Sequence, residues 1–233
     1  MAKNMIKYVL IDWDNTVWDF SANSALSLSE CYVEFGLDSF FESDDDFATR
    51  YYAANDALWA RYRAGEVSRH YLVEHRFYDT LMSVGISDMD LARRLNGAYL
   101  EYVEYKSELV PGAVDVVEYL RARGYVLVVV TNGFSDVQRR KLRNSGIQHL
   151  FDYTVLSEDA GALKPSREFF DYVFRHTGAV PGQSIVIGDD AESDISGAVK
   201  YGLKCVYFNR FGHPCPYPAD YEISSLYQLK AIL

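Results

Sequence analysis

The sequence predicts an α/β fold, a doubly wound parallel sheet into which an all-helical domain is inserted. Short, almost continuously apolar segments alternate with helical segments through the second half of the chain, as expected for parallel strands covered by helices on both faces. One more such segment lies near the N-terminus, and roughly ninety residues with the apolar spacing of helices separate it from the others. The 233 residues suffice for such a core and a smaller second domain.

The first strand is predicted at Tyr8–Ile11, where the apolar run YVLI is followed at once by two aspartates. Residues 20–108 then carry apolar side chains at three- and four-residue spacing, which predicts four amphipathic helices and no strand. Gly36, Gly65 and Gly85 separate these helices, since glycine commonly follows the last turn of a helix.

After residue 108, helices and strands are expected to alternate strictly. Pro111 marks a helix start and Gly124 the end of that helix, because proline is tolerated in a first helical turn and glycine favours a C-cap. The predicted strands are 125–130, 153–156, 184–187 and 204–208, and the predicted helices are 114–123, 135–146, 166–178 and 193–202. The predicted domains are a core of residues 1–19 and 109–233 and a helical domain of residues 20–108.

The composition limits the kinds of partner. The formal net charge is −10, from 23 Lys and Arg against 33 Asp and Glu, which disfavours nucleic acid polymers and anionic membranes but not a small anion. The three cysteines form no CxxC pair and predict neither a disulfide framework nor a zinc site. The N-terminal apolar run is too short for a signal sequence or a membrane span. We therefore expect a cytoplasmic protein, a monomer or small homo-oligomer, with a small-molecule partner.

Aspartates follow two of the predicted strands. In parallel sheets the ligand site lies beyond the carboxyl ends of the strands, and these aspartates should meet there. Asp12 and Asp14 are two positions apart and should point the same way in extended chain, and Asp189 and Asp194 follow another strand. A single aspartate at a strand end is usually a turn former or helix cap. A group of them predicts a Mg²⁺ site, with oxygens from Asp12, from Asp189 and from the backbone carbonyl of Asp14.

Two other strand ends carry groups suited to an anion. Thr131 ends an apolar run, and its hydroxyl and the backbone N–H groups of Asn132 and Gly133 precede a helix, where phosphate often binds. Lys164 lies in a loop at the same edge and could offset the clustered negative charge. Taken singly, Thr131 would more often be a helix cap and Lys164 a solvated charge.

The segments DWDNT, TNG, LKP and GDDAESD resemble, in order and spacing, the four motifs of the haloacid dehalogenase superfamily. An all-helical insert between the first two motifs is similar to the cap of one large branch of that superfamily. The resemblance implies a Rossmann-like core and a Mg²⁺-dependent phosphate monoester hydrolase that forms an aspartyl-phosphate. The site residues that it implies are Asp12 as nucleophile, Asp14 as general acid and then base, Thr131, Asn132 and Gly133 around the phosphoryl oxygens, Lys164 as neutralising cation, Asp189 on the metal and Asp194 in support of it.

Asp14 and the helical domain distinguish between reactions within the superfamily. Dehalogenases lack an acid at the position of Asp14, since a halide leaves without a proton, so dehalogenation is disfavoured. Phosphonatases carry a lysine in a cap helix, whereas the sole lysine among residues 20–108 is Lys106 at their end.

Two segments of the helical domain, ANDALWARYRAGEVS and HRF, are similar to segments of bacterial pyrimidine 5′-nucleotidases. The resemblance implies hydrolysis of (deoxy)pyrimidine nucleoside monophosphates, with Trp59 and Arg76 as candidate contacts to the leaving group. Aromatic residues at helical spacing can equally form the core of the domain. The chain departs from that branch at Asn15, where an acid is expected, and in the DAGALKP loop. The matching positions are Asn55, Leu58, Trp59, Tyr62, Gly65, Arg76 and Phe77.

Two other functions remain open. The second and fourth motifs are also similar to those of sugar-phosphate phosphatases such as the N-acylneuraminate-9-phosphatases. A non-catalytic binding module is disfavoured because both Asp12 and Asp189 are present, and a mutase because the helical domain offers no evident base. Residues 211–218, after the last predicted strand, are expected to form an exposed loop without an assigned role.

Overall fold

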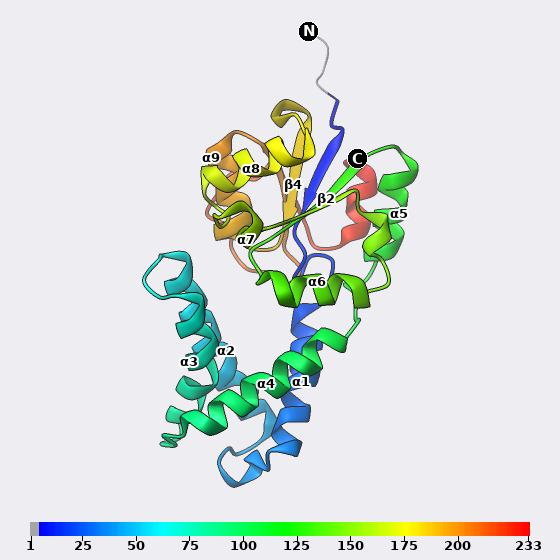
Figure 1. Ribbon diagram of the computed structural model, residues 1–233. Coiled ribbons are helices and arrows are strands. Elements are labelled where there is room, and N and C mark those ends of the chain that lie inside the picture. The colour runs from blue at the N-terminus through cyan, green and yellow to red at the C-terminus, as the bar shows by residue number, and fades with distance from the viewer. Residues whose placement is uncertain (1–4) are drawn as a thin grey trace. The chain divides into compact units, whose positions relative to one another are not determined.

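The computed structural model of the protein describes residues 5–233 and divides into two compact units. The core unit comprises the chain up to Phe20 together with Ser107–Leu233, and the helical unit comprises Ser21–Lys106. Figure 1 shows the strands in the core unit and helices α1 to α4 in the other.

The core unit contains a parallel sheet of six strands in the order β3-β2-β1-β4-β5-β6. The chain leaves the central strand β1 in one direction and later returns to build β4, β5 and β6 on its other side. Strand order therefore reverses between β1 and β4, where a ligand site is expected in open α/β sheets. The predicted doubly wound sheet is confirmed. The strands are β1 (Tyr8–Ile11), β2 (Val126–Thr131), β3 (Tyr153–Leu156), β4 (Ser184–Gly188), β5 (Lys204–Phe208) and β6 (Tyr221–Ile223).

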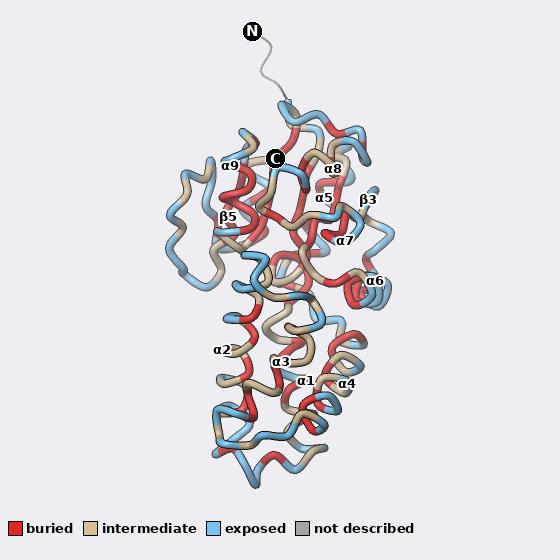
Figure 2. The backbone as a smooth tube through the Cα atoms, turned by 60° about the vertical axis from the view of Figure 1, so that its left-hand side comes forward, coloured by how far each residue is buried: buried red, intermediate tan, exposed pale blue. Residues whose placement is uncertain are grey.

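Figure 2 shows buried backbone, in red, in the interior of the core unit, where β5 and α9 are labelled. Apolar side chains of α8 and α9 belong to the same buried cluster as those of the strands. Phe169, Phe170 and Val173 of α8 repeat at helical spacing and are fully buried in the same cluster as Val128 and Val130 of β2. Figure 1 shows α8 and α9 on one side of the sheet and α5 on the other, so the strands can be apolar almost throughout. The helices are α5 (Ala113–Ala122), α6 (Ser135–Asn144), α7 (Ser157–Ala160), α8 (Arg167–Thr177) and α9 (Ser196–Tyr201).

The C-terminal part contains two elements that the sequence analysis did not predict. The three-residue strand β6 pairs with β5, and a 3₁₀ helix follows at Leu226–Ala231. A strand of three residues is too short to show an apolar period, whereas Ser225 begins the 3₁₀ helix with a capping box. Residues 211–218 form a mostly exposed loop, although Cys215 and Tyr217 pack partly against the core.

The helical unit consists of the four expected helices and a short 3₁₀ turn at Leu37–Ser39. Three of the helices begin with a side chain that caps a backbone N–H group, as Ser43, Ser68 and Asp88 do. Its interior is aromatic: the ring centroid of Tyr51 lies 4.8 Å from that of Phe77 and 5.2 Å from that of Tyr99. The helices are α1 (Phe20–Glu34), α2 (Asp44–Arg63), α3 (Arg69–Met82) and α4 (Met89–Tyr105).

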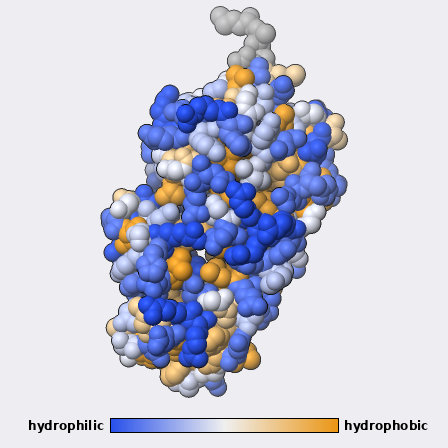
Figure 3. Space-filling view, viewed as in Figure 1, coloured by the Kyte–Doolittle hydropathy of each residue, from blue (hydrophilic) through white to orange (hydrophobic). Residues whose placement is uncertain are grey.

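The surface is mainly hydrophilic in the view of Figure 3, with apolar residues scattered among charged ones. Among the described residues no helix combines the length and the apolar character needed to cross a membrane. Cys31, Cys205 and Cys215 are free thiols. Burial raises the pKa of Cys31 to about 12, so this thiol stays protonated at neutral pH and is a poor nucleophile.

Candidate active site

Asp12 and Lys164 form the centre of the site at the end of β1. The backbone N–H of Asp12 donates to the carbonyl of Ile187 at 2.9 Å, so the residue continues the pairing of β1 with β4. Its carboxylate Oδ1 lies 2.6 Å from Lys164 Nζ. Lys164 is 1% exposed and uses its three N–H groups fully, since it also donates to Asp194 Oδ1 at 2.7 Å and to the carbonyl of Val130 at 2.9 Å.

Asn132 holds the loop that carries Lys164. Its side-chain Nδ2 donates to the carbonyl of Lys164 at 2.9 Å, and its Oδ1 accepts from the backbone N–H of the same residue at 2.8 Å. From the sequence, only the backbone N–H of Asn132 is expected to contribute, as a donor to phosphate. The side chain thus has a second part in the site, because it ties the end of β2 to the cation that faces Asp12.

Asp12, Asp189 and Asp194 bring one carboxylate oxygen each to within 4.8 Å of one another. Thr16, directly after the Asp12 turn, donates from Oγ1 to Asp189 Oδ1 at 3.0 Å. Gly188 is required beside them, because a Cβ atom there would lie 2.2 Å from Asp194 Oδ2. The neighbouring Asp190 has the ordinary role of a cap, since its Oδ1 accepts from two backbone N–H groups of the following turn.

Burial controls the protonation of this cluster. It raises the pKa of Asp189 to about 8, with a further contribution from Asp194, and it raises the pKa of Asp12 and of Asp194 although Lys164 opposes both shifts. Burial alone would lower the pKa of Lys164, but Asp12 and Asp194 outweigh it and keep the ammonium charged. Ionised, three carboxylates against one ammonium leave two negative charges in a buried space.

These residues fit a divalent cation with oxygen ligands. Mg²⁺ prefers a few carboxylate and carbonyl oxygens, and the oxygens of Asp12 and Asp189 provide such a set. Both carboxylate oxygens of Asp194 accept hydrogen bonds: Oδ1 from Lys164, and Oδ2 from the backbone N–H of Asp190 at 3.2 Å. Asp194 is therefore suited to support the metal site rather than to ligate the metal directly. A bound divalent cation would compensate the two excess negative charges.

The metal-free protein is expected to lose stability as the pH rises from about 6.5 to about 9. Asp189 has its usual pKa of 3.8 in the unfolded chain and about 8 in the folded one, so the folded state binds this proton more tightly. The resulting stabilisation is complete below the usual pKa and is lost as the pH rises through about 8. Urea unfolding in EDTA at both pH values measures it.

Two variants and added Mg²⁺ test whether Asp189 causes this pH dependence. Asp189→Asn should reduce the pH dependence, whereas Asp115→Asn, which removes an exposed carboxylate of α5, should leave it unchanged. Added Mg²⁺ should stabilise the wild type more at the higher pH. Equal stability of the metal-free wild type at both pH values would contradict the expectation.

Asp14 is held by two residues that the sequence analysis did not single out. Lys141 Nζ donates to Asp14 Oδ1 at 2.9 Å, and Gln138 Nε2 donates to Asp14 Oδ2 at 2.7 Å. Both come from α6, where they are three residues apart and so face the same way. In the sequence they stand in QRRK, which reads like any solvated, basic helix face, so no local signal distinguishes them.

Thr131 is the last residue of β2 and marks the turn that leads to α6. Its Oγ1 accepts from the backbone N–H of Gly133 at 3.1 Å and from Gln138 Nε2 at 2.8 Å. A Cβ atom on Gly133 would lie 2.4 Å from Gln138 Nε2, so glycine is needed for Gln138 to enter the site. At the corresponding turn after β1, Asn15 has a φ of +60°, which asparagine tolerates better than most residues.

The two predicted substrate contacts of the helical unit have different surroundings. Trp59 on α2 is half-buried and packs edge-on against Tyr62 with ring centroids 5.6 Å apart. Arg76 on α3 is 6% exposed and donates from Nε to Asn96 Oδ1 at 2.7 Å. Its guanidinium Cζ lies 5.3 Å from the ring centroid of Tyr99. Its Nη2 is buried and has no hydrogen-bond partner among the described residues.

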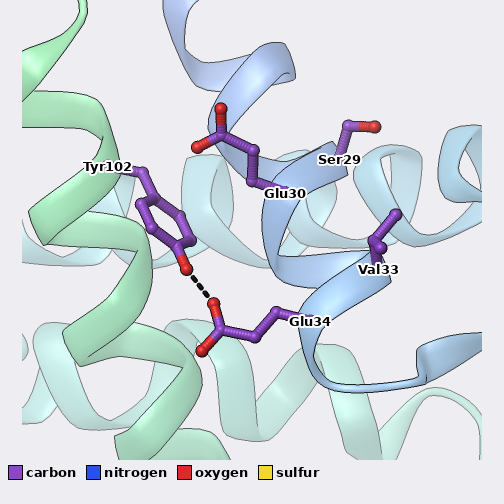
Figure 4. Close-up of a pocket in the computed structure, with 5 residues that line it drawn as sticks. All are labelled: Ser29, Glu30, Val33, Glu34 and Tyr102. Carbon is purple, nitrogen blue, oxygen red and sulfur yellow. Dashed lines mark hydrogen bonds between the residues drawn. The ribbon is translucent and has the colours of Figure 1, made fainter.

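A pocket of about 420 Å³ opens on the helical unit between α1 and α4 (Figure 4). Tyr102 donates its hydroxyl hydrogen to a carboxylate oxygen of Glu34 there. None of the predicted site residues lines this pocket, and its acidic character does not suit a phosphate. The lining residues are Ser29, Glu30, Val33, Glu34 and Tyr102.

Comparisons with known proteins find similar proteins over most of the chain. A model of the haloacid dehalogenase-like hydrolases matches residues 6–202. The HAD-hydrolase YfnB of Bacillus subtilis (strain 168) is 31% identical over 225 residues, which are 96% of this chain and 91% of YfnB. A crystal structure of YfnB bound to magnesium matches with a TM-score of 0.87 at 31% identity, over 98% of this chain and 99% of that chain.

The relatives whose names state a substrate include a nucleotidase and a sugar-phosphate phosphatase. Pyrimidine 5′-nucleotidase YjjG of Escherichia coli (strain K12) is 28% identical over 230 residues, 97% of each chain. Ribulose-1,5-bisphosphate 5-phosphatase of Halopiger xanaduensis is 29% identical over 211 residues, which are 88% of this chain and 85% of that protein.

Proposed function

The chain belongs to the haloacid dehalogenase-like hydrolases and is a phosphoric monoester hydrolase, and on that premise we propose that it is a Mg²⁺-dependent 5′-nucleotidase for pyrimidine nucleoside monophosphates. One observation carries the chemical part of the proposal. Asp12 is paired with the buried Lys164 beside Asp189 and Asp194, while Asp14 is held apart by other donors. A nucleophile and a proton carrier are thus present at one sheet edge as separate carboxylates.

Asp12 is the proposed nucleophile. Its carboxylate attacks phosphorus and forms an aspartyl-phosphate, which divides the hydrolysis into two displacements. Lys164 neutralises charge on Asp12 and on the phosphoryl oxygens, and Thr131 and the backbone N–H groups of Asn132 and Gly133 hold those oxygens. Mg²⁺, held by Asp12, Asp189 and the carbonyl of Asp14, would supply further positive charge to the phosphoryl group when bound.

Asp14 is the proposed proton carrier. It protonates the leaving oxygen in the first displacement and accepts a proton from the attacking water in the second. An alkoxide leaving group requires such a proton, whereas a halide does not. The presence of Asp14 therefore supports ester hydrolysis over dehalogenation.

The helical unit and the relatives support a nucleotide as substrate. The similarity to YjjG extends along almost the whole chain, helical unit included. Arg76, the candidate contact to the leaving group, lies in that unit, and its Nη2 is buried without a hydrogen-bond partner among the described residues. The similarity to ribulose-1,5-bisphosphate 5-phosphatase favours a sugar phosphate as the second candidate.

A substrate panel tests this proposal. We expect kcat/KM with Mg²⁺ to be at least about tenfold higher for dUMP and dTMP than for ribose 5-phosphate, N-acetylneuraminate 9-phosphate and ribulose 1,5-bisphosphate, which corresponds to one well-made polar contact to the base. Purine monophosphates serve as the matched comparison, because they share the phosphate and sugar. A sugar phosphate with equal or higher kcat/KM would overturn the nucleotide assignment but not the phosphatase chemistry.

A further inference from the structure

Gln138 and Lys141 have no role in the reaction outlined above, yet they are the side chains that hold Asp14. Lys141 is 5% exposed in its side chain and Gln138 is 1% exposed, although both belong to a helix rich in charged residues. Each oxygen of the Asp14 carboxylate accepts from one of them, at 2.9 Å and 2.7 Å. The orientation of the carboxylate is therefore fixed by two donors from a single helix face.

The ordinary explanation, a surface ion pair on a helix, does not fit these two residues. The ammonium of Lys141 lies 4.1 Å from the ring centroid of Trp18, which is fully buried, so its charge is removed from solvent. Gln138 also links Asp14 to Thr131, since its Nε2 lies within 2.8 Å of both Thr131 Oγ1 and Asp14 Oδ2. The requirement for glycine at position 133 exists because this side chain occupies the space.

We propose that Gln138 and Lys141 are positioning residues that aim Asp14 at the leaving oxygen of the substrate, and thereby set how well the enzyme cleaves esters whose leaving group needs a proton. This inference rests on the proposed phosphatase function. Gln138 donates both to Asp14 Oδ2 and to Thr131, so it relates the orientation of the Asp14 carboxylate to the proposed phosphate position. Lys141 holds the other oxygen, Oδ1. A group that transfers a proton must be held within hydrogen-bond reach of its target, so loss of either donor should impair the transfer.

The proton transfers balance in both displacements. In the first, an Asp12 oxygen bonds to phosphorus, the phosphorus–oxygen bond to the leaving group breaks with its electron pair on that oxygen, and Asp14 gives this oxygen its proton. In the second, a water oxygen bonds to phosphorus, its proton passes to Asp14, and the bond between phosphorus and Asp12 breaks with its electron pair returning to the carboxylate. Only the first displacement depends on the leaving group.

The dependence on the leaving group gives the test. p-Nitrophenolate leaves without a proton, whereas the 5′-oxygen of a nucleotide or of ribose 5-phosphate does not. The value of kcat/KM reports steps only up to the departure of the leaving group, so it excludes the second displacement. We therefore compare kcat/KM for p-nitrophenyl phosphate with that for dUMP and ribose 5-phosphate, in wild type, Lys141→Met and Gln138→Met, which keep similar side-chain volumes.

We expect kcat/KM for the two alkyl esters to fall by about 10- to 100-fold in either variant, and that for p-nitrophenyl phosphate by less than about threefold. The burst of p-nitrophenol should grow relative to steady turnover, because the second displacement also needs Asp14. Lys141→Arg should restore part of the alkyl-ester activity, since it retains a cationic donor. Arg143→Met removes an exposed cation from the same helix. It should change neither kcat/KM for the three esters nor the size of the burst relative to steady turnover.

A double-mutant cycle distinguishes an effect on the orientation of Asp14 from a general effect on the stability of the protein. In an Asp14→Asn background, Lys141→Met should cause no further loss of kcat/KM for ribose 5-phosphate, because the group to be aimed is gone. Equal losses on aryl and alkyl esters, or an undiminished loss in the Asp14→Asn background, would overturn the inference and leave the phosphatase function intact. A wild type that hydrolyses none of the three esters with Mg²⁺ would instead overturn the function on which the inference rests.

Discussion

Replacing Asp12 with asparagine is expected to lower kcat for phosphate ester hydrolysis by about 10⁴-fold or more, because the attacking carboxylate oxygen is lost. The fold should persist. Asparagine has the same shape, and its amide oxygen can still accept a hydrogen bond from Lys164, which also keeps Asp194 and the carbonyl of Val130 as acceptors. Steady-state hydrolysis of the best substrate measures the loss, and circular dichroism checks the fold.

The control for this variant is Asp115→Asn, an exposed carboxylate of α5 that accepts a hydrogen bond from Tyr227. It removes the same charge from the same unit and should retain wild-type turnover. Acid-quenched incubation with ³²P-labelled substrate should label the wild type and not Asp12→Asn. A variant at position 12 that turned over at the wild-type rate would show that another group attacks phosphorus.

Replacing Lys164 with methionine is expected to reduce both activity and stability. The buried carboxylates of Asp12 and Asp194 lose their cation, which should lower the free energy of unfolding of the metal-free protein by about 3–5 kcal/mol. Loss of the charge that faces the phosphoryl group should lower kcat by about 10²- to 10³-fold. Urea unfolding in EDTA and steady-state kinetics with Mg²⁺ measure the two effects separately.

The stability loss in Lys164→Met should be smaller at low pH, because the freed carboxylates can then take up protons and shed their charge. Lys200→Met is the matched control, since Lys200 is an exposed lysine of α9 and its removal should be neutral in both measurements. Unfolding free energies for Lys164→Met within the error of the wild type would contradict the assignment of Lys164 as the cation that compensates this cluster.

The family and the fold class could be predicted because their signals are local in sequence. The apolar runs at β1, β2 and β4 predict a buried parallel sheet, and motif residues at their ends predict a shared edge. The predicted sheet is confirmed by the strand order, and the predicted family by the match of the family model. β6 was missed because its three residues give no period, and because parallel pairing with β5 needs partners supplied by the fold.

The contacts within the candidate site could be predicted only in part. Asp12, Asp189 and Lys164 follow predicted strands or precede a predicted helix, so topology alone suggests that they meet. Gln138 and Lys141 lie in the middle of α6, where the sequence shows a basic helix surface and the burial of their side chains depends on how that helix packs. Leaving-group contacts depend on the helical unit, whose aromatic residues serve its own core, and they stay a prediction.

The central place of β1 in the sheet has a consequence for biosynthesis. Tyr8 pairs with Val126 on one side and with Ser184 on the other, so the strand that bears Asp12 leaves the ribosome long before either neighbour exists. At about 5–20 residues per second, translation needs on the order of ten seconds to reach β2 and several more to reach β4. During that time the apolar strand β1 lacks the two strands with which it pairs in the folded protein. The proposed nucleophile is made before both neighbouring strands, and its surroundings are completed only after β4 has emerged.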